Sequence, residues 1–264
     1  MEGLMKAWRA FDPDQHPMIF PGDREFIRPE DHYTHRTYEE FVAEVGAGTK
    51  DALSPLVDEQ RLHLGLLPGP FTGDPLSAKV VLLNLNPGFG ASDYFVETHS
   101  RECRQTAIRN LRGDFQNMEF PFWMFDPRLL CHSGSDYWRG KFKDILDLCQ
   151  QKNRASYLAS LKWLSSLVAT LELCPYHSHR SPQLDLKTLP SAQLAKRFVH
   201  ETLLPKAEKG AVVVVCTRRV ADWGLSETCR QVVCYTRPGE ARSGNIGKNT
   251  RGGKAIIEIL GLNR

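Results

Sequence analysis

KVVLLNLNPGFGASDY, residues 79–94, is the most informative stretch of this sequence. Residues 80–85 are almost all β-branched or leucine, and they run directly into Asn86, Pro87 and Gly88. A short apolar run that is closed by Pro and Gly is typical of a strand buried on both faces, as strands of parallel sheets are. Ligands bind beyond the carboxyl ends of such strands. We therefore expect the loop that starts at Asn86 to hold the functional site.

Three further segments have the composition of buried strands, and helical patterns lie between them. The strand candidates are residues 169–174, 211–216 and 231–235, and the helix candidates are 101–111, 138–149, 157–168, 191–204 and 254–260. Strands that alternate with helices predict a mostly parallel sheet covered on both faces, with right-handed crossovers. The predicted fold class is α/β, as a three-layer α/β/α sandwich around a central four-stranded, mostly parallel sheet.

The N-terminal quarter has a different character and predicts a helical extension of the sandwich. Residues 1–35 show no clear periodicity and are interpreted as an arm on the main body. Residues 37–40, Thr-Tyr-Glu-Glu, have the form of a capping box, which predicts a helix that starts there. A second helix is expected at 51–64, followed by an irregular, turn-rich shelf at 67–75. The predicted organisation is an N-terminal arm with helices over 1–66, packed on an α/β domain over 67–264.

Composition excludes some partners and leaves others open. The 264 residues are 25% charged and 41% apolar, with a net charge of only +3, so a nucleic-acid surface would have to come from local clustering. No run of 18 apolar residues occurs, and the N-terminus lacks the apolar centre of a signal peptide. The seven cysteines are odd in number and never in C-x-x-C spacing, which favours reduced thiols. We expect a cytoplasmic monomer without a membrane contact or a cofactor.

The strand-end motif resembles that of the uracil-DNA glycosylase superfamily, especially its mismatch-specific branch. That branch has G-[IL]-N-P-G after its first strand; here Leu85-Asn86-Pro87-Gly88 matches, and Asn84 replaces the leading glycine. The family's last motif, typically His-Pro-Ser, follows the fourth strand. Here the corresponding loop retains Pro238 and Ser243 but has no histidine. By topology the resemblance covers residues 67–260, and it implies an α/β/α sandwich with a four-stranded sheet that binds a flipped base.

The resemblance also implies roles for residues in two of the strand-end loops. Hydrolysis of an N-glycosidic bond requires an extruded base, an oriented water and stabilisation of the departing anion. The catalytic candidates are Asn86, which would position the water, and His177, which would donate to the base; the base-binding candidates are Pro87, Gly88, Phe89 and Tyr176. An amide is not a general base, so slow turnover is expected. The alternative for Asn86 is a turn residue that caps its own loop.

The loop after the last strand predicts a nucleic-acid contact. Residues 236–254 carry five basic residues against one acid, with five glycines, a composition suited to phosphate contacts. The nucleic-acid-binding candidates are Arg237, Arg242, Ser243, Lys248 and Arg251. The alternative is a solvated, flexible loop. Cys174, His177 and His179 have metal-ligand spacing, but the sequence offers no evident fourth ligand, so no metal is expected.

Three functional hypotheses remain open at this stage. The first is a DNA glycosylase of base-excision repair that binds a flipped, uracil-like base and hydrolyses its N-glycosidic bond. The second is a catalytically weak or inactive module of the same fold, with single- or double-stranded DNA or another nucleobase-containing ligand as its partner. The third is an unrelated α/β hydrolase or transferase, although the sequence has no G-x-S-x-G elbow and no G-x-G-x-x-G after a strand.

Overall fold

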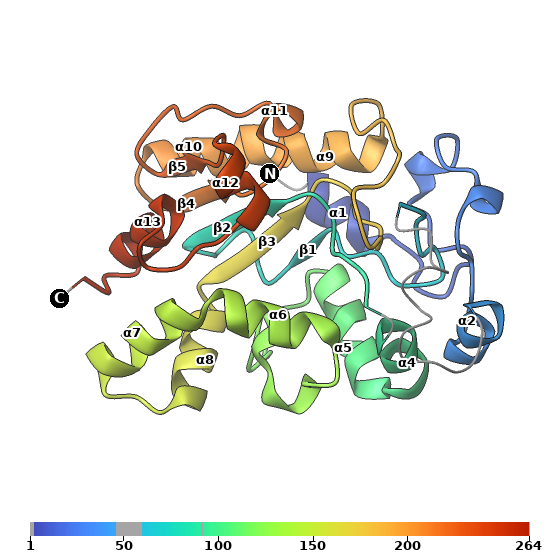
Figure 1. Ribbon diagram of the computed structural model, residues 1–264, viewed down its shortest axis with the longest axis horizontal. Coiled ribbons are helices and arrows are strands. Elements are labelled where there is room, and N and C mark those ends of the chain that lie inside the picture. The colour runs from blue at the N-terminus through green and yellow to red at the C-terminus, as the bar shows by residue number, and fades with distance from the viewer. Residues whose placement is uncertain (1–2, 46–59, 91, 264) are drawn as a thin grey trace.

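A mixed sheet forms the centre of the molecule (Figure 1). The computed structural model describes residues 3–45, 60–90 and 92–263. Within these residues, five strands pair in the order β1-β3-β2-β4-β5. All neighbours are parallel except β1, which is antiparallel to β3. The strands are β1 (Phe71–Thr72), β2 (Val80–Asn84), β3 (Val168–Glu172), β4 (Val213–Cys216) and β5 (Val232–Cys234).

The four predicted strands are found near their predicted positions, but the prediction of a four-stranded sheet was wrong. The fifth strand, β1, lies in the segment 67–75, which the sequence had indicated as an irregular shelf. Its two residues follow Pro70 and precede Gly73, whose φ is +78°. Phe71 pairs with Leu171 at the edge of the sheet. Two residues are too few for a periodic pattern, so only the long-range pairing with β3 reveals the strand.

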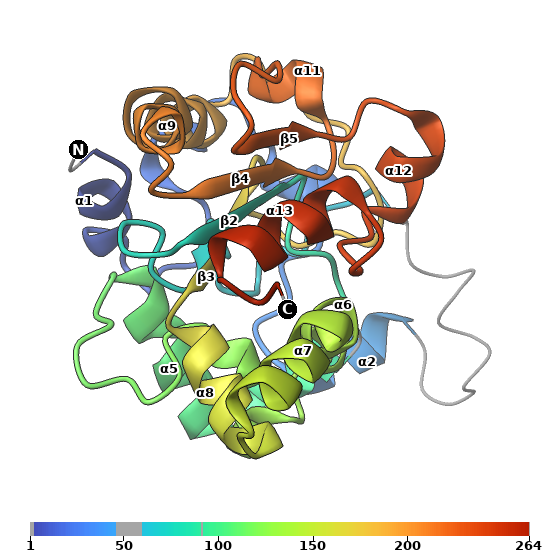
Figure 2. The ribbon, with the colours of Figure 1, turned by 90° about the vertical axis from the view of Figure 1, so that its left-hand side faces the viewer.

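Helices cover both faces of the sheet, as Figures 1 and 2 show. Alternate residues of β2 enter two separate apolar clusters, because successive side chains of a strand point to opposite faces. Val81 and Leu83 pack with residues of α1, α9, α10 and α11. Val80 and Leu82 pack with residues of α6, α7, α8 and α13. The fold is therefore an α/β sandwich, with apolar packing on either side of the sheet.

The α-helices are bounded as follows. They are α1 (Gly3–Arg9), α2 (Tyr38–Val45), α4 (Ser92–His99), α5 (Arg101–Leu111), α6 (Ser133–Lys141), α7 (Lys143–Asn153), α8 (Tyr157–Ser165), α9 (Pro190–Phe198), α10 (Leu204–Glu208), α11 (Val220–Trp223), α12 (Pro238–Ser243) and α13 (Arg251–Ile259). Short 3-10 helices are η1 (Pro21–Asp23), η2 (Pro29–Asp31), η3 (Trp123–Phe125) and η4 (Pro127–Leu129), and a π-helical segment, η5 (Val199–Leu203), joins α9 to α10.

Several helix predictions are confirmed and others need correction. The helix predicted at 101–111 coincides with α5. The segment 138–149 is divided between α6 and α7 at Phe142, and Val168, predicted on a helix face, begins β3. In the predicted helix at 51–64, residues 51–59 lie outside the described residues, and 60–64 are not helical. There Tyr33 N–H donates to the carbonyl of Leu62, and Leu64 N–H donates to the carbonyl of Tyr33.

The N-terminal arm contributes to the main core. Leu4 and Trp8 of α1 are almost fully buried in the cluster that contains Val81 of β2. At the start of α2, Thr37 Oγ1 accepts a hydrogen bond from Glu40 N–H, and the Glu40 carboxylate accepts one from Arg36 N–H. This is close to the predicted capping box. In the described part of the chain, no helix has the length and apolarity needed to cross a membrane.

The strand order locates one special position in the sheet. The chain passes from β2 to β3 on one side and then crosses to β4 on the other side of β2. The connection from β2 to β3 packs α6, α7 and α8 on one face, whereas the connection from β3 to β4 packs α9 and α10 on the opposite face. Such a reversal opens a crevice beyond the carboxyl ends of the two strands concerned. The crevice expected here lies beyond β2 and β4.

Candidate functional site

Three polar side chains meet where the central parallel strands end. Asn84, the last residue of β2, donates a hydrogen bond of 2.9 Å from Nδ2 to Oε1 of Glu172, the last residue of β3. The sheet places these two residues directly opposite each other. Thr217 follows β4, and its hydroxyl lies 2.9 Å from Asn84 Oδ1 and 3.2 Å from the Leu83 carbonyl oxygen. We name Asn84, Glu172 and Thr217 the strand-end triad.

The triad is buried, and one of its oxygen atoms is unpaired. Glu172 is 5% exposed, and its Oε2 has no hydrogen-bond partner among the described residues. Burial raises the pKa of the Glu172 carboxyl to about 8, although the bond from Asn84 and the charge of Lys141 lower it. A carboxyl group that is mostly protonated at neutral pH can both donate and accept a hydrogen bond. The unpaired oxygen is thus a polar group suited to a ligand.

Asn86 lies two residues beyond Asn84 of the triad, and its orientation is fixed by Ser178. Its Nδ2 donates to the Ser178 carbonyl oxygen at 3.0 Å and to Ser178 Oγ at 2.9 Å. The Ser178 hydroxyl donates its own proton to the Arg180 carbonyl, so its oxygen can only accept from Asn86. The NH₂ side of the amide therefore faces Ser178. Oδ1 of Asn86, which is half-buried, has no donor among the described residues and can accept from a water molecule.

His177 connects the loop after β2 to the segment before β1. Its Nδ1 lies 2.9 Å from the Gly88 carbonyl oxygen, and its Nε2 lies 3.1 Å from the Leu67 carbonyl oxygen. Gly88 has a φ of +78°, a conformation that glycine adopts without strain. The imidazole is 9% exposed. In this structure the predicted catalytic histidine lies between the Asn-Pro-Gly loop and the segment before β1, with one ring nitrogen facing a carbonyl of each.

Phe89, the predicted stacking residue, already has an aromatic partner. The Phe89 ring stacks on His63 with centroids 3.5 Å apart and an interplanar angle of 12°. His63 is also stacked on Tyr33, at 4.8 Å. Burial lowers the pKa of His63 to about 2, with further lowering by the neighbouring His177 and His35. Because His63 covers one face of Phe89, only the opposite face can receive a base.

Tyr176 is not brought to the rim of the site. Its ring belongs to the core cluster and is 2% exposed. Its hydroxyl donates to Asp23 Oδ2 at 2.5 Å and accepts from Phe20 N–H at 3.1 Å. The tyrosine therefore attaches the N-terminal arm to the sheet, whereas sequence reasoning had placed it on a base. Pro87, another base-binding candidate, follows Asn86 in the same loop and is half-buried.

The loop after β5 is more ordered than its glycine content suggests. It contains α12, and Arg237, Arg242 and Ser243 are exposed there. The Ser243 hydroxyl donates to the Glu240 carbonyl and accepts from Asn245 N–H. Lys248 is exposed and is anchored through its backbone N–H, which donates to Asp144 Oδ2 at 2.9 Å. Arg237, Arg242 and Lys248 thus keep their charged groups on the surface, as a nucleic-acid contact would require.

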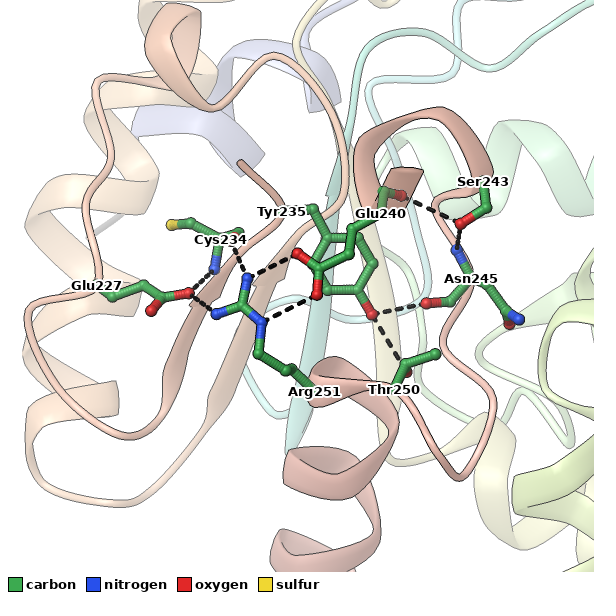
Figure 3. A network of polar contacts seen from close by, with 8 residues as sticks. All are labelled: Glu227, Cys234, Tyr235, Glu240, Ser243, Asn245, Thr250 and Arg251. Carbon is green, nitrogen blue, oxygen red and sulfur yellow. Dashed lines mark hydrogen bonds and ion pairs between the residues drawn. The ribbon is translucent and has the colours of Figure 1, made fainter. Parts of the chain in front are cut away.

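Arg251 is used differently from the other candidates in this loop (Figure 3). Its guanidinium makes two hydrogen bonds to the Glu240 carboxylate, at 3.1 and 2.9 Å. It also donates to Glu227 Oε1 at 2.5 Å and to the Cys234 carbonyl at 2.7 Å. These bonds raise the pKa of Arg251, Glu240 contributing the most. The guanidinium is consumed by contacts within the chain, so Arg251 positions the loop instead of offering a charge to phosphate.

Two further contacts bring the C-terminal loop to the strand-end triad. A Cβ atom on Gly244 would lie 3.2 Å from Lys141 Nζ and 3.7 Å from Thr217 Cβ, so the backbone after α12 passes over Thr217. Arg218, which follows Thr217, donates to the Arg242 carbonyl at 3.3 Å. The three predicted loops therefore share a rim: Asn86 touches the turn after β3, and the loop after β5 reaches the triad through Thr217.

Cys174 does not act with His177 and His179 as a ligand group. The thiol is fully buried in the core, and burial raises its pKa to about 12. Within the described residues, no three His, Cys, Asp or Glu side chains gather in a metal-binding arrangement. All seven cysteines have free thiols, and the sulfur atoms of Cys103 and Cys131 lie 3.6 Å apart.

Sequence reasoning missed four residues of the site. The triad members Asn84, Glu172 and Thr217 and the neighbouring Lys141 were not among the candidates. The first three had a detectable signal, since each is a polar residue at the carboxyl end of an apolar strand. Lys141 had none, because it ends α6, which enters the site only through the tertiary fold.

Neither a protein-family model, nor a curated protein, nor a solved structure matches this chain. Any functional assignment must therefore come from the geometry of the site and from the short motifs that form it.

Proposed function

We propose that this protein is a glycosylase of the uracil-DNA glycosylase type, which binds a flipped nucleobase in DNA and hydrolyses its N-glycosidic bond. The observation that carries the proposal is that Asn86, held by the turn after β3, follows the strand-end triad at the carboxyl edge of the parallel strands. The Asn86 amide, whose oxygen can hold a water, follows Asn84 by two residues, and Asn84 donates to the buried Glu172 carboxyl, which has an unpaired oxygen. Both are located where open α/β sheets bind their ligands.

The two polar groups suit the two ends of the reaction. Asn86 Oδ1 can accept a hydrogen bond from the attacking water and orient it toward the sugar. Protonated Glu172 can donate from its unpaired oxygen to a carbonyl of the base, where negative charge develops as the bond breaks. The pKa of about 8 keeps most of this carboxyl neutral at pH 7. The specific α/β/α glycosylase architecture is part of the same proposal.

The exposed basic groups around the rim suit the DNA backbone. Arg237, Arg242 and Lys248 have exposed side chains in the loop after β5, and Lys141 lies against that loop. Phosphate contacts of this kind position a duplex without reading its sequence. Their affinity falls with salt because bound counterions are released. Replacing Arg237 and Arg242 together by alanine should weaken binding to all DNA sequences alike and reduce the salt dependence.

A product assay tests the proposal directly. Labelled oligonucleotides that contain uracil, a thymine mismatch or hypoxanthine are incubated with the protein, and abasic sites are revealed by alkaline cleavage. Asn86→Ala should lower the rate by about 10²-fold or more, because it removes the only group proposed to hold the water. Asn153→Ala, at an exposed position on α7, is the matched control and should leave the rate unchanged.

The same assay separates the enzyme from a binding module. Abasic product from the native protein that disappears in Asn86→Ala supports hydrolysis. Salt-sensitive DNA binding without product from any of the three substrates would support the module, in which the fold retains a base pocket but lacks catalysis. If the protein gives no abasic product and does not bind DNA, both functions are refuted.

A further inference from the structure

A polar cavity lies away from the strand-end triad, between the N-terminal arm and α4. Its volume is about 340 Å³, within the range of small-molecule sites. The N-terminal arm contributes residues 14–16 and Met18 to the lining, and α4 contributes Tyr94, Glu97 and Thr98. Arg36, which precedes α2, and Arg104, in α5, complete the polar lining. None of these residues belongs to the proposed catalytic site.

The cavity contains a buried donor without an acceptor. Tyr94 is 1% exposed, and its ring is stacked on Phe41 with centroids 4.7 Å apart. Its hydroxyl is buried and has no hydrogen-bond partner among the described residues. Burial raises the pKa of this hydroxyl, and the nearby Glu97 raises it further, so the group keeps its proton. A buried O–H that lacks an acceptor costs folding free energy unless a ligand or a water supplies one.

The acids that line the cavity are already engaged. Both carboxylate oxygens of Glu97 accept from Leu67 N–H, at 3.2 and 3.1 Å. Burial raises the pKa of Glu97 to about 8, so this group is mostly neutral at pH 7. Asp14 lies 3.4 Å from Arg104 Nη2. The acids therefore leave no strong demand for a positively charged ligand.

The two arginines that line the cavity differ in how far they are engaged. Arg104 donates to the Pro13 carbonyl at 2.8 Å, faces Asp14 and lies 3.8 Å from Glu97 Oε2. The guanidinium of Arg36 has no hydrogen-bond or ion-pair partner among the described residues, since only its backbone N–H is bonded, to Glu40. The Glu40 carboxylate lies beside the Arg36 backbone, outside the cavity lining. The unpaired polar groups that line the cavity, the Tyr94 hydroxyl and the Arg36 guanidinium, are thus both hydrogen-bond donors.

From these contacts we propose that the cavity binds a small anion, a carboxylate or a phosphate monoester, which accepts hydrogen bonds from the Tyr94 hydroxyl and from the Arg36 guanidinium. Planar guanidinium groups bind both kinds of oxyanion through two hydrogen bonds. The Tyr94 hydroxyl supplies a third bond from inside the cavity. This site goes beyond the proposed glycosylase function and does not depend on it.

Calorimetric titration of the full chain with inorganic phosphate and, separately, with acetate tests the proposal at constant ionic strength. Saturable binding of either probe is expected, and the tighter of the two identifies the preferred oxyanion. Arg36→Gln should weaken that binding about tenfold or more, because a charge-assisted hydrogen bond is lost. Arg28→Gln, another exposed arginine without a side-chain partner among the described residues, is the matched control and should change affinity less than about twofold.

Tyr94→Phe provides an independent readout. It keeps the ring stacked on Phe41 and removes only the hydroxyl, so the melting temperature without a probe should rise while phosphate or acetate binding weakens about tenfold. A lower melting temperature would show that the hydroxyl has a structural partner and would overturn the proposal. Absence of saturable binding by both probes would also overturn it, as would equal losses in Arg36→Gln and Arg28→Gln.

Discussion

Glu172 and Glu240 are two carboxylates in regions that use their polar groups in opposite ways. Glu172, in the strand-end triad, is almost fully buried, accepts one hydrogen bond and leaves Oε2 unpaired. Glu240, in the C-terminal loop, is partly exposed, and both of its oxygens are bonded to Arg251. Burial raises the pKa of Glu172, whereas the bonds from Arg251 lower the pKa of Glu240.

The two regions therefore differ in whether their polar groups are fully paired within the chain or left open to a ligand. A saturated network such as that of Arg251, Glu227, Glu240 and the Cys234 carbonyl stabilises one arrangement of the chain. A buried group that lacks a partner costs free energy and is retained where a ligand satisfies it. The loop after β5 is therefore a fixed support, and the strand-end triad is the reactive part of the proposed site.

The largest expected effect comes from Glu172→Gln and concerns the pH dependence of the free energy of unfolding. In the unfolded chain this carboxyl ionises near pH 4.5, whereas in the fold it keeps its proton up to about pH 8. Between these values the folded state holds one more proton, so the free energy of unfolding falls by about 1.4 kcal/mol per pH unit. Urea unfolding at several pH values from 5 to 8 should show a smaller slope in Glu172→Gln.

Two other carboxyl groups serve as references for the slope measured in Glu172→Gln. Burial also raises the pKa of Glu97 to about 8, so the variant should retain the slope that Glu97 contributes. Glu240→Gln is the control from the saturated network. Because the folded pKa of Glu240 is lowered, its contribution is present above its unfolded pKa and disappears as the pH falls. An unchanged slope in Glu172→Gln would mean that this carboxyl is ionised in the fold and would remove the contrast between the regions.

Gly253→Ala tests how tightly the C-terminal support is packed. A Cβ atom there would lie 2.0 Å from the Gly247 carbonyl oxygen and 2.6 Å from that of Ile246, so backbone must move. We expect a loss of about 1–3 kcal/mol in the free energy of unfolding. Gly140→Ala, in α6, meets nothing within 4 Å and should stabilise the protein by about 0.5–1 kcal/mol. Similar effects of the two substitutions would contradict a close-packed loop.

Arg251→Ala should have the smallest effect of the three. It leaves the Glu227 and Glu240 carboxylates facing each other without their shared partner (Figure 3). The Arg251 side chain is 37% exposed, so screening by solvent limits the expected loss to about 1–2 kcal/mol. Arg230→Ala, which breaks only the exposed pair with Glu258, should cost less than about 1 kcal/mol. Chemical denaturation compares the two, and equal losses would mean that the network adds nothing to a single surface pair.

The sequence predicted the parts of the fold that are local and missed those that depend on long-range pairing. Apolar runs identified β2, β4 and β5, an alternating pattern identified β3, and amphipathic spacing identified α5. The two-residue β1 has no pattern of its own. Phe142 fits the apolar periodicity of 138–149, and that pattern carries no sign of the break between α6 and α7.

The candidate site was predictable to a similar degree. The contact between the loop of Asn86 and the turn of His177 and Ser178 agrees with loops that meet at the carboxyl edge of a parallel sheet. Which atom of each side chain faces inward was not predictable. Tyr176 follows a strand end, as a site residue would, but its ring packs in the core and its hydroxyl binds Asp23. Arg251 lies in a basic loop, but its guanidinium is bonded to Glu240 and Glu227.

The outer border of β5 has a consequence for self-association. Cys234 N–H donates to Glu227 Oε1, and the Cys234 carbonyl accepts from Arg251, so side chains occupy backbone groups that another strand would need. At the opposite border, β1 offers only two residues next to Pro70. Occupied or very short borders hinder the edge-to-edge joining of sheets that leads to aggregates. The interactions that hold the C-terminal loop thus also occupy backbone groups that would otherwise be open to another strand at this border.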